Sequence, residues 1–186
     1  SEPASWTAGG KVVHVDRVEW VAMPDDMTAA NALLNREIDY IELVPFDLLP
    51  MLESKKEIKV AILDNVGLWT YYRFNFLHPP FNNQKVRQAA LAAMAQEPFL
   101  RAQVGIKEFY RPCASMFTCN TPYGSTKGSD IQSKSNMKKA QELVKASGYD
   151  GTAVVIIKPT DLAAIQKLPD VAAQLLRQAG FKVDLQ

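Results

Sequence analysis

Strand-like and helix-like patterns alternate along the 186-residue chain, and this alternation constrains the fold more than any other feature. β-Branched and aromatic residues at every second position indicate strands, whereas apolar residues three or four positions apart indicate helices. Strands that alternate with helices are typical of the α/β class. We therefore expect an α/β fold with a mixed sheet flanked by helices. No internal repeat or clear linker divides the chain, so residues 1–186 are predicted to form one unit.

Five segments have the pattern of strands: residues 12–23, 58–63, 68–76, 152–157 and 181–185. In the third of these, large rings alternate with polar groups, as in a sheet with one covered face. Residues 64–67 have the types that a tight turn prefers, which separates the second strand from the third.

Helices are predicted at residues 27–35, 46–54, 84–95, 98–104 and 136–146, with a last helix that ends at Ala179. Asp25 and Asp26 are placed to cap the first helix, and Gly148 and Gly180 to end the last two. Pro169 is expected either to kink the last helix or to begin its main segment. Residues 105–133, rich in Pro, Gly, Ser and Thr, are expected to be irregular.

The overall charge and hydropathy exclude several classes of protein. The chain has 21 Lys and Arg residues against 20 Asp and Glu residues. Its net charge of +1 therefore does not indicate a basic surface for nucleic acid. No apolar run approaches the roughly 18 residues that span a bilayer. No secretory leader is visible at the start, and the chain ends on a predicted strand. These ends favour a piece of a longer chain.

The residues needed for catalysis do not form a coherent set. Only two histidines are present, His14 in a predicted strand and His78 before a Pro-Pro pair, and neither accompanies a recognisable nucleophile. The sequence has no Gly-x-Ser-x-Gly elbow, no Walker loop and no dinucleotide-binding glycine motif. We therefore expect neither an enzyme nor a protein with a cofactor.

The two cysteines, Cys113 and Cys119, are separated by five residues in the irregular segment. This spacing is unusual for zinc, and no second Cys or His pair accompanies it, so no metal site is expected. A disulfide that closes a short loop is the favoured interpretation, and it implies an oxidising compartment. Two free thiols in a cytosolic loop are the alternative.

One stretch, YRFNFLHPPFNNQKVRQA at residues 72–89, closely resembles the family 5 extracellular solute-binding proteins. These are the dipeptide-, oligopeptide- and nickel-binding components of ABC importers. Three further motifs follow the family's order, at residues 18–39, 138–149 and 175–185. Arg36 stands where the family usually has Gly, and Gln96-Glu97 replaces the usual Asp-Arg or Asp-Lys.

The resemblance implies one lobe of a type II periplasmic-binding-protein fold. In this family two lobes close around a ligand, and residues 1–186 are similar to most of the C-terminal lobe. The resemblance thus implies a solute or short peptide as ligand, a missing N-terminal lobe, a membrane permease as partner, and a periplasmic or extracellular location. It does not identify the solute.

Ligands of open α/β sheets lie at strand ends, where residues 158–163 form a predicted strand-to-helix junction. These residues are similar to the family loop that approaches the far end of the ligand. Pro159, Thr160 and Asp161 are therefore candidate ligand contacts, although the Asp161 carboxylate could instead cap the helix. Glu42 and Trp69 are weaker candidates, since a ring in an alternating strand is more often part of the core.

The sequence leaves two alternative functions to consider. A ligand-sensing domain of the same fold within a regulator would share these motifs, and a DNA-binding module in the parent protein would distinguish it. A small α/β enzyme is poorly supported, because the sequence lacks a coherent nucleophile, base or metal site.

Overall fold

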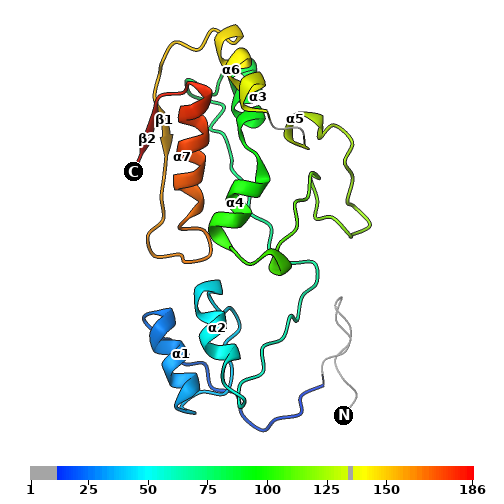
Figure 1. The fold of residues 1–186 in the computed structure, drawn as a ribbon, viewed down its shortest axis with the longest axis vertical. Helices are drawn as coiled ribbons and strands as arrows, with labels where there is room; N and C mark the ends of the chain where they lie inside the picture. Colours follow the sequence, from blue (N-terminus) through cyan, green and yellow to red (C-terminus); the bar gives the residue numbers. More distant parts are fainter. Residues whose placement is uncertain (1–11, 134–135) are drawn as a thin grey trace. The chain divides into compact units, whose positions relative to one another are not determined.

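The computed structural model describes residues 12–133 and 136–186. The chain divides into two compact units, Ser1–Val44 and Pro45–Gln186. In chain order the elements are α1 (Asp26–Leu34), the 3-10 helix η1 (Phe46–Leu48), α2 (Leu49–Glu53), α3 (Gln84–Ala93), α4 (Gln96–Gln103), the 3-10 helix η2 (Lys107–Phe109), α5 (Asp130–Ser133), α6 (Met137–Ala146), β1 (Val154–Ile156), α7 (Leu168–Ala179) and β2 (Val183–Leu185) (Figure 1). Within the described ranges, no helix is long and apolar enough to cross a bilayer.

The first unit contains α1, whose two ends follow the predicted signals. Asp25 is the N-cap, and its carboxylate accepts hydrogen bonds from the backbone N–H and the hydroxyl of Thr28. These bonds, the hydroxyl's first, lower the pKa of Asp25. At the other end, Arg36 N–H donates to Leu33 and Glu37 N–H donates to Ala32, which is a Schellman motif.

Arg36 occupies the left-handed position of that motif, with φ of +62°. This is the position at which the family pattern usually has Gly. Arg36 therefore holds its Cβ atom in a backbone conformation that sterically disfavours a Cβ, which lowers the stability of the folded state by about 1–2 kcal/mol.

The second unit is built around a β1–α7–β2 arrangement. β1 and β2 are parallel, with Val154 opposite Val183 and Ile156 opposite Leu185. In Figure 1, α7 runs alongside this sheet. The buried residues of α7 recur three or four positions apart, as expected for a helix that covers a core with one face. They are Leu168, Pro169, Ala172, Ala173, Leu176 and Ala179.

Alanines line the contacts between the helices of this unit. α3 packs most extensively on α6, and both also contact α7. Ala89 and Ala90 of α3, Ala140 of α6 and Ala172 of α7 are completely buried. Because these side chains are small, the helices can approach closely. The amide of Asn83 joins two of them: its Oδ1 caps α3 at Lys85 N–H, and its Nδ2 donates to Ser147 O after α6.

The predicted α/β class and the helix positions are confirmed. Pro169 lies in the first turn of α7, so it begins the helix rather than kinking it. Gly148 and Gly180 have φ of +75° and +104°. Phe181 N–H donates to Leu176 O and Gly180 N–H to Arg177 O, which closes α7 with a second Schellman motif.

Among the described residues the sheet has two parallel strands, and the antiparallel neighbours expected for a mixed sheet are not among them. Within the described ranges, residues 12–23, 58–63 and 68–76 form neither helix nor strand ladder. Alternation identifies the two faces of a segment, whereas a strand also needs a neighbour for its N–H and C=O groups. The sequence pattern therefore contains no information on which segment would be the neighbour.

The irregular segment carries the predicted disulfide between Cys113 and Cys119. Its base is fixed on the first turn of α4, where the Gln96 amide donates to Cys113 O and accepts from Cys113 N–H, both at 2.7 Å. The adjacent Tyr110 hydroxyl donates to Glu97, and this bond contributes most to lowering the pKa of that carboxyl.

Replacing the strained residue should stabilise the protein. Arg36→Gly is expected to raise the free energy of unfolding by about 0.5–1 kcal/mol, because removing the steric strain of the Cβ atom at positive φ outweighs the extra conformational entropy that glycine loses on folding. Arg36→Ala, which keeps the Cβ atom, should give no such gain. Urea unfolding of the three proteins measures the difference, and equal stability of the Gly and Ala variants would contradict the strain.

Removing the central side chain of α7 should destabilise the second unit. Leu176 is 1% exposed, so Leu176→Ala is expected to lower the free energy of unfolding by about 2–5 kcal/mol. Gln174→Ala, on the exposed side of the same helix, should change it by less than about 0.5 kcal/mol. Thermal unfolding followed by circular dichroism would test this, and similar midpoints for both variants would show that α7 is not central to the core.

Candidate ligand-binding site

Residues 158–167 connect the carboxyl end of β1 to the start of α7, where α/β folds commonly bind ligands. The beginning of this loop is held to the sheet. Lys158 N–H donates to Gln186 O at 2.6 Å, and the Lys158 ammonium forms a 2.7 Å ion pair with Asp170 in the first turn of α7. The cation nearest the loop's start is therefore already paired.

The rest of the loop makes two further contacts with the unit. The Gln103 amide of α4 donates to Ala163 O at 3.0 Å, across 60 residues of sequence. Lys167 pairs with Asp47 of η1 at 2.9 Å, but both side chains are solvent-accessible and the pair contributes little stability. The loop backbone also closes on itself, because Ile165 and Gln166 N–H both donate to Leu162 O.

Thr160 and Asp161 lie between these fixed points, and both are exposed. Neither side chain has a hydrogen-bond partner among the residues that the structure describes. The helix-cap hypothesis for Asp161 is wrong, because α7 begins at Leu168 and has no side-chain cap. The loop is longer than the sequence pattern indicated, so the carboxylate stays available to a ligand.

The structure does not bring all of the predicted contacts together. Pro159 is half-buried beside Thr160 and Asp161 on this loop. Glu42 is exposed in the unit Ser1–Val44, and the structure does not join it to them. Trp69 is 41% exposed against the Tyr71 ring, with centroids 6.3 Å apart, so its interpretation as a core residue is wrong for the described residues.

Sequence reasoning missed two groups that hold the loop, Gln103 and Asp170, and a third, Tyr72, that lies near Asp170. Tyr72 stacks on Phe99 with ring centroids 5.7 Å apart. Burial, followed by the nearby negative charge of Asp170, raises the pKa of the Tyr72 hydroxyl, so it remains a neutral O–H donor at physiological pH. No sequence signal marks Gln103, because its partner is a backbone carbonyl.

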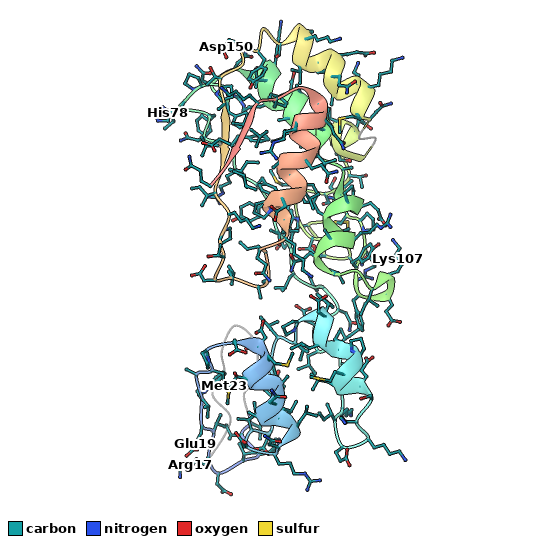
Figure 2. All side chains as sticks on the ribbon, turned by 60° about the vertical axis from the view of Figure 1, so that its left-hand side comes forward. Arg17, Glu19, Met23, His78, Lys107 and Asp150 are labelled. Atoms are coloured by element: carbon teal, nitrogen blue, oxygen red, sulfur yellow. A yellow bond between two sulfur atoms is a disulfide. The ribbon has the colours of Figure 1, made fainter. Side chains whose placement is uncertain are left out.

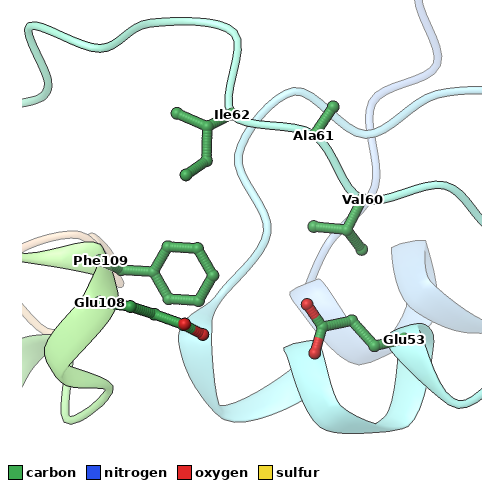
Figure 3. Close-up of a pocket in the computed structure, with 6 residues that line it drawn as sticks. All are labelled: Glu53, Val60, Ala61, Ile62, Glu108 and Phe109. Atoms are coloured by element: carbon green, nitrogen blue, oxygen red, sulfur yellow. The ribbon is translucent and has the colours of Figure 1, made fainter.

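A separate hollow of about 360 Å³ lies in the second unit (Figure 3). Val60, Ala61 and Ile62 form one wall, and Phe109 faces them. Glu53 of α2 and Glu108 of η2 place two carboxylates at its rim. It includes none of the predicted contacts. Across the described ranges, no group of three or more His, Cys, Asp or Glu side chains could hold a metal ion.

Removing the Gln103 bond should loosen the loop without unfolding the protein. Gln103 Oε1 is buried without a partner within the described residues, so Gln103→Leu deletes an unsatisfied acceptor together with the bond. Hydrogen exchange of residues 159–167 is expected to become several-fold faster while the thermal midpoint changes little. Gln174→Leu serves as the control, and unchanged exchange in Gln103→Leu would show that the bond does not hold the loop.

Comparison with known proteins agrees with these observations. The family model "Bacterial extracellular solute-binding proteins, family 5 Middle" matches residues 3–186. The probable peptide ABC transporter periplasmic-binding protein y4tO of Sinorhizobium fredii is 36% identical over 187 residues, which cover 99% of this chain and 35% of that protein. The glutathione-binding protein GsiB of Escherichia coli K12 is 24% identical, over 97% of this chain and 34% of that protein.

Solved structures also resemble this chain. The ABC transporter substrate-binding protein CtaP of Listeria monocytogenes aligns with a TM-score of 0.69 and 25% identity, over 87% of this chain and 33% of that one. A periplasmic oligopeptide-binding protein of Borrelia burgdorferi aligns with a TM-score of 0.55 and 17% identity, over 88% of this chain and 32% of that one, which shows the fold alone.

The fold is thus that of type II periplasmic binding proteins, and the chain spans about a third of the length of the relatives it matches. The comparisons do not support the alternative of a regulator's sensing domain. Because the family model covers nearly all of the sequence, the chain belongs to the family 5 bacterial extracellular solute-binding proteins.

Proposed function

We propose that this chain supplies one wall of the ligand cleft in the peptide receptor of an ABC importer, and that the β1–α7 loop is the part that contacts the ligand. The observation that carries the proposal is the loop itself. Its backbone is held at Lys158 and Ala163, while the side chains of Thr160 and Asp161 are exposed and have no partner among the residues that the structure describes. A loop whose backbone is already fixed loses less conformational entropy when its free polar groups bind a ligand.

The chemistry of the loop favours one kind of ligand group. The Asp161 carboxylate accepts hydrogen bonds and attracts positive charge, and the Thr160 hydroxyl both donates and accepts. Both lysines of the loop are already paired, Lys158 with Asp170 and Lys167 with Asp47. The loop therefore suits a peptide's amide N–H or cationic group better than its carboxylate end. Peptide chemistry is supported by the names of two relatives, y4tO and the glutathione-binding GsiB.

The rest of the assembly follows from the family. Residues 1–186 form most of the C-terminal lobe in this proposal, and the N-terminal lobe comes from the two thirds of the relatives' length that this chain does not span. Trp69 and Glu42 are secondary candidates for contact with the ligand. The complete protein works in the periplasm or outside the cell without catalysing a reaction, delivers its solute to a membrane permease, and has no nucleic-acid partner.

The test is a titration of the full-length protein with two probes, tri-alanine and glutathione. Asp161→Asn is expected to weaken binding of the probe that binds wild type by about tenfold, since a hydrogen bond to a charged group contributes about 1.5–3 kcal/mol. Thr160→Ala should weaken it about fivefold. Glu142→Gln, at an exposed site on α6, should leave affinity unchanged. If Asp161→Asn and Thr160→Ala bind the probe with the affinity of the wild type, the loop does not contact the ligand.

A further inference from the structure

The two ends of the Cys113–Cys119 bridge are held by different parts of the molecule. At one end, the amide of Gln96 in the first turn of α4 bonds both the N–H and the C=O of Cys113. These two bonds fix the backbone of Cys113 to a helix that itself packs on α7. Cys113 is therefore the anchored end of the bridge.

The segment just before Cys113 is held against α4 as well. The Tyr110 hydroxyl donates to the Glu97 carboxylate at 2.9 Å. The Lys107 ammonium, labelled in Figure 2, lies 3.3 Å from the same carboxylate and 4.4 Å from the centre of the Tyr110 ring. Opening the disulfide would leave all of these contacts in place.

The Cys119 end is held by the loop alone. Among the described residues, the hydrogen bonds of residues 118–121 all stay within the loop: the Thr121 hydroxyl donates to Thr118 O, and Gly124 N–H donates to Thr121 O. A Cβ atom at Gly124 would lie 3.1 Å from Thr118 O, so the two backbone segments approach closely there. This end of the bridge has no contact with a helix to hold it.

A hollow of about 370 Å³ opens beside the Cys119 end. Cys119 is one of its lining residues and Cys113 is not. The six residues that line it are uncharged, and three of them carry hydroxyl groups: Ser115, Cys119, Asn120, Gly124, Ser125 and Thr126. A small polar molecule, including an anion, can therefore reach Cys119 without meeting a carboxylate in the lining.

Hydrogen bonding distinguishes the two sulfur atoms. Cys119 N–H donates to Cys113 Sγ at 3.1 Å, whereas Cys119 Sγ has no donor among the described residues. When a thiolate attacks a disulfide, the sulfur that leaves takes up a negative charge, and the exchange is faster when that charge is stabilised. Attack on Cys119 expels the sulfur that already has a donor, and attack on Cys113 does not.

We propose that Cys119 is a site of reversible modification by a small thiol that enters this hollow. The thiol loses its proton to solvent, and its thiolate attacks Cys119 Sγ. A new disulfide forms between the thiol and Cys119, while the bond between Cys119 and Cys113 breaks. The electron pair of that bond stays on Cys113 Sγ, which then takes a proton from water. Electrons and protons balance with the thiol as the only co-reactant.

The modification would open the loop at one end only. Cys113 stays on Gln96, and residues 114–119 are released, with Met116 and Phe117 among them. The attack of the Cys113 thiolate on the mixed disulfide would reverse the step. The inference goes beyond the proposed function, because the site shares no residue with the β1–α7 loop.

Trapping of the mixed disulfide in the full-length oxidised protein tests the proposal. The probe is 2-mercaptoethanesulfonate, a small thiol that is not a peptide. Early samples are quenched with excess N-ethylmaleimide, and peptide masses assign each cysteine. We expect at least about tenfold more adduct on Cys119 than on Cys113, with N-ethylmaleimide on Cys113. Equal amounts, adduct chiefly on Cys113, or no adduct where the urea-unfolded protein is modified would each overturn the proposal.

The urea-unfolded protein, with its bridge intact, is the control for the role of the fold. Unfolding removes both the hollow and the hydrogen bond to Cys113 Sγ, so the preference for Cys119 is expected to fall to within about twofold. A preference that persists in urea would come from the neighbouring sequence and would overturn the assignment to the folded site.

A matched pair of variants tests access through the hollow. Thr126→Trp places a large ring in the lining and is expected to slow formation of the Cys119 adduct at least about fivefold. Met116→Trp adds the same ring at a side chain that is 78% exposed and outside the lining, and should change the rate by less than about twofold. Equal rates in both variants and the wild type would overturn the proposal. Neither measurement uses a peptide, so each is independent of the titration that tests the proposed function.

Discussion

The close contact of three alanine-lined helices is the constraint on which the second unit depends. α3, α6 and α7 meet through side chains no larger than a methyl group at Ala89, Ala140 and Ala172, all completely buried. This contact places α7 over β1 and β2, and the position of α7 in turn sets the length and direction of the β1–α7 loop. A larger side chain at any of these alanines would separate the helices, because a close-packed interior has no room for extra methylene groups.

Local signals in the sequence were sufficient for the helices. Asp25, Asn83 and Asn136 begin helices with side-chain caps, and Pro169 marks the first turn of α7. Each of these signals acts within a few residues, so it can be recognised without knowledge of the fold. The disulfide was also predictable, because the two cysteines are near in sequence and share one irregular segment.

The candidate site and the sheet were harder to predict because they depend on distant partners. The bond from Gln103 to Ala163 crosses 60 residues and ends on a backbone carbonyl, which carries no side-chain signature. The cap hypothesis for Asp161 failed because the pattern gave the junction but not the length of the loop before Leu168. Alternation in residues 68–76 showed a strand-like period, yet nothing local identifies a neighbouring strand. The prediction that residues 1–186 form one lobe stays a prediction.

The Cys113–Cys119 bridge has a consequence for how the protein matures. The chain has two cysteines, so oxidation can form one intramolecular bridge within these residues and no incorrect one. The loop that it closes is short, so the entropy removed from the unfolded chain corresponds to only about 2 kcal/mol. A nascent chain that reaches an oxidising compartment can thus close this bridge before any helix has formed.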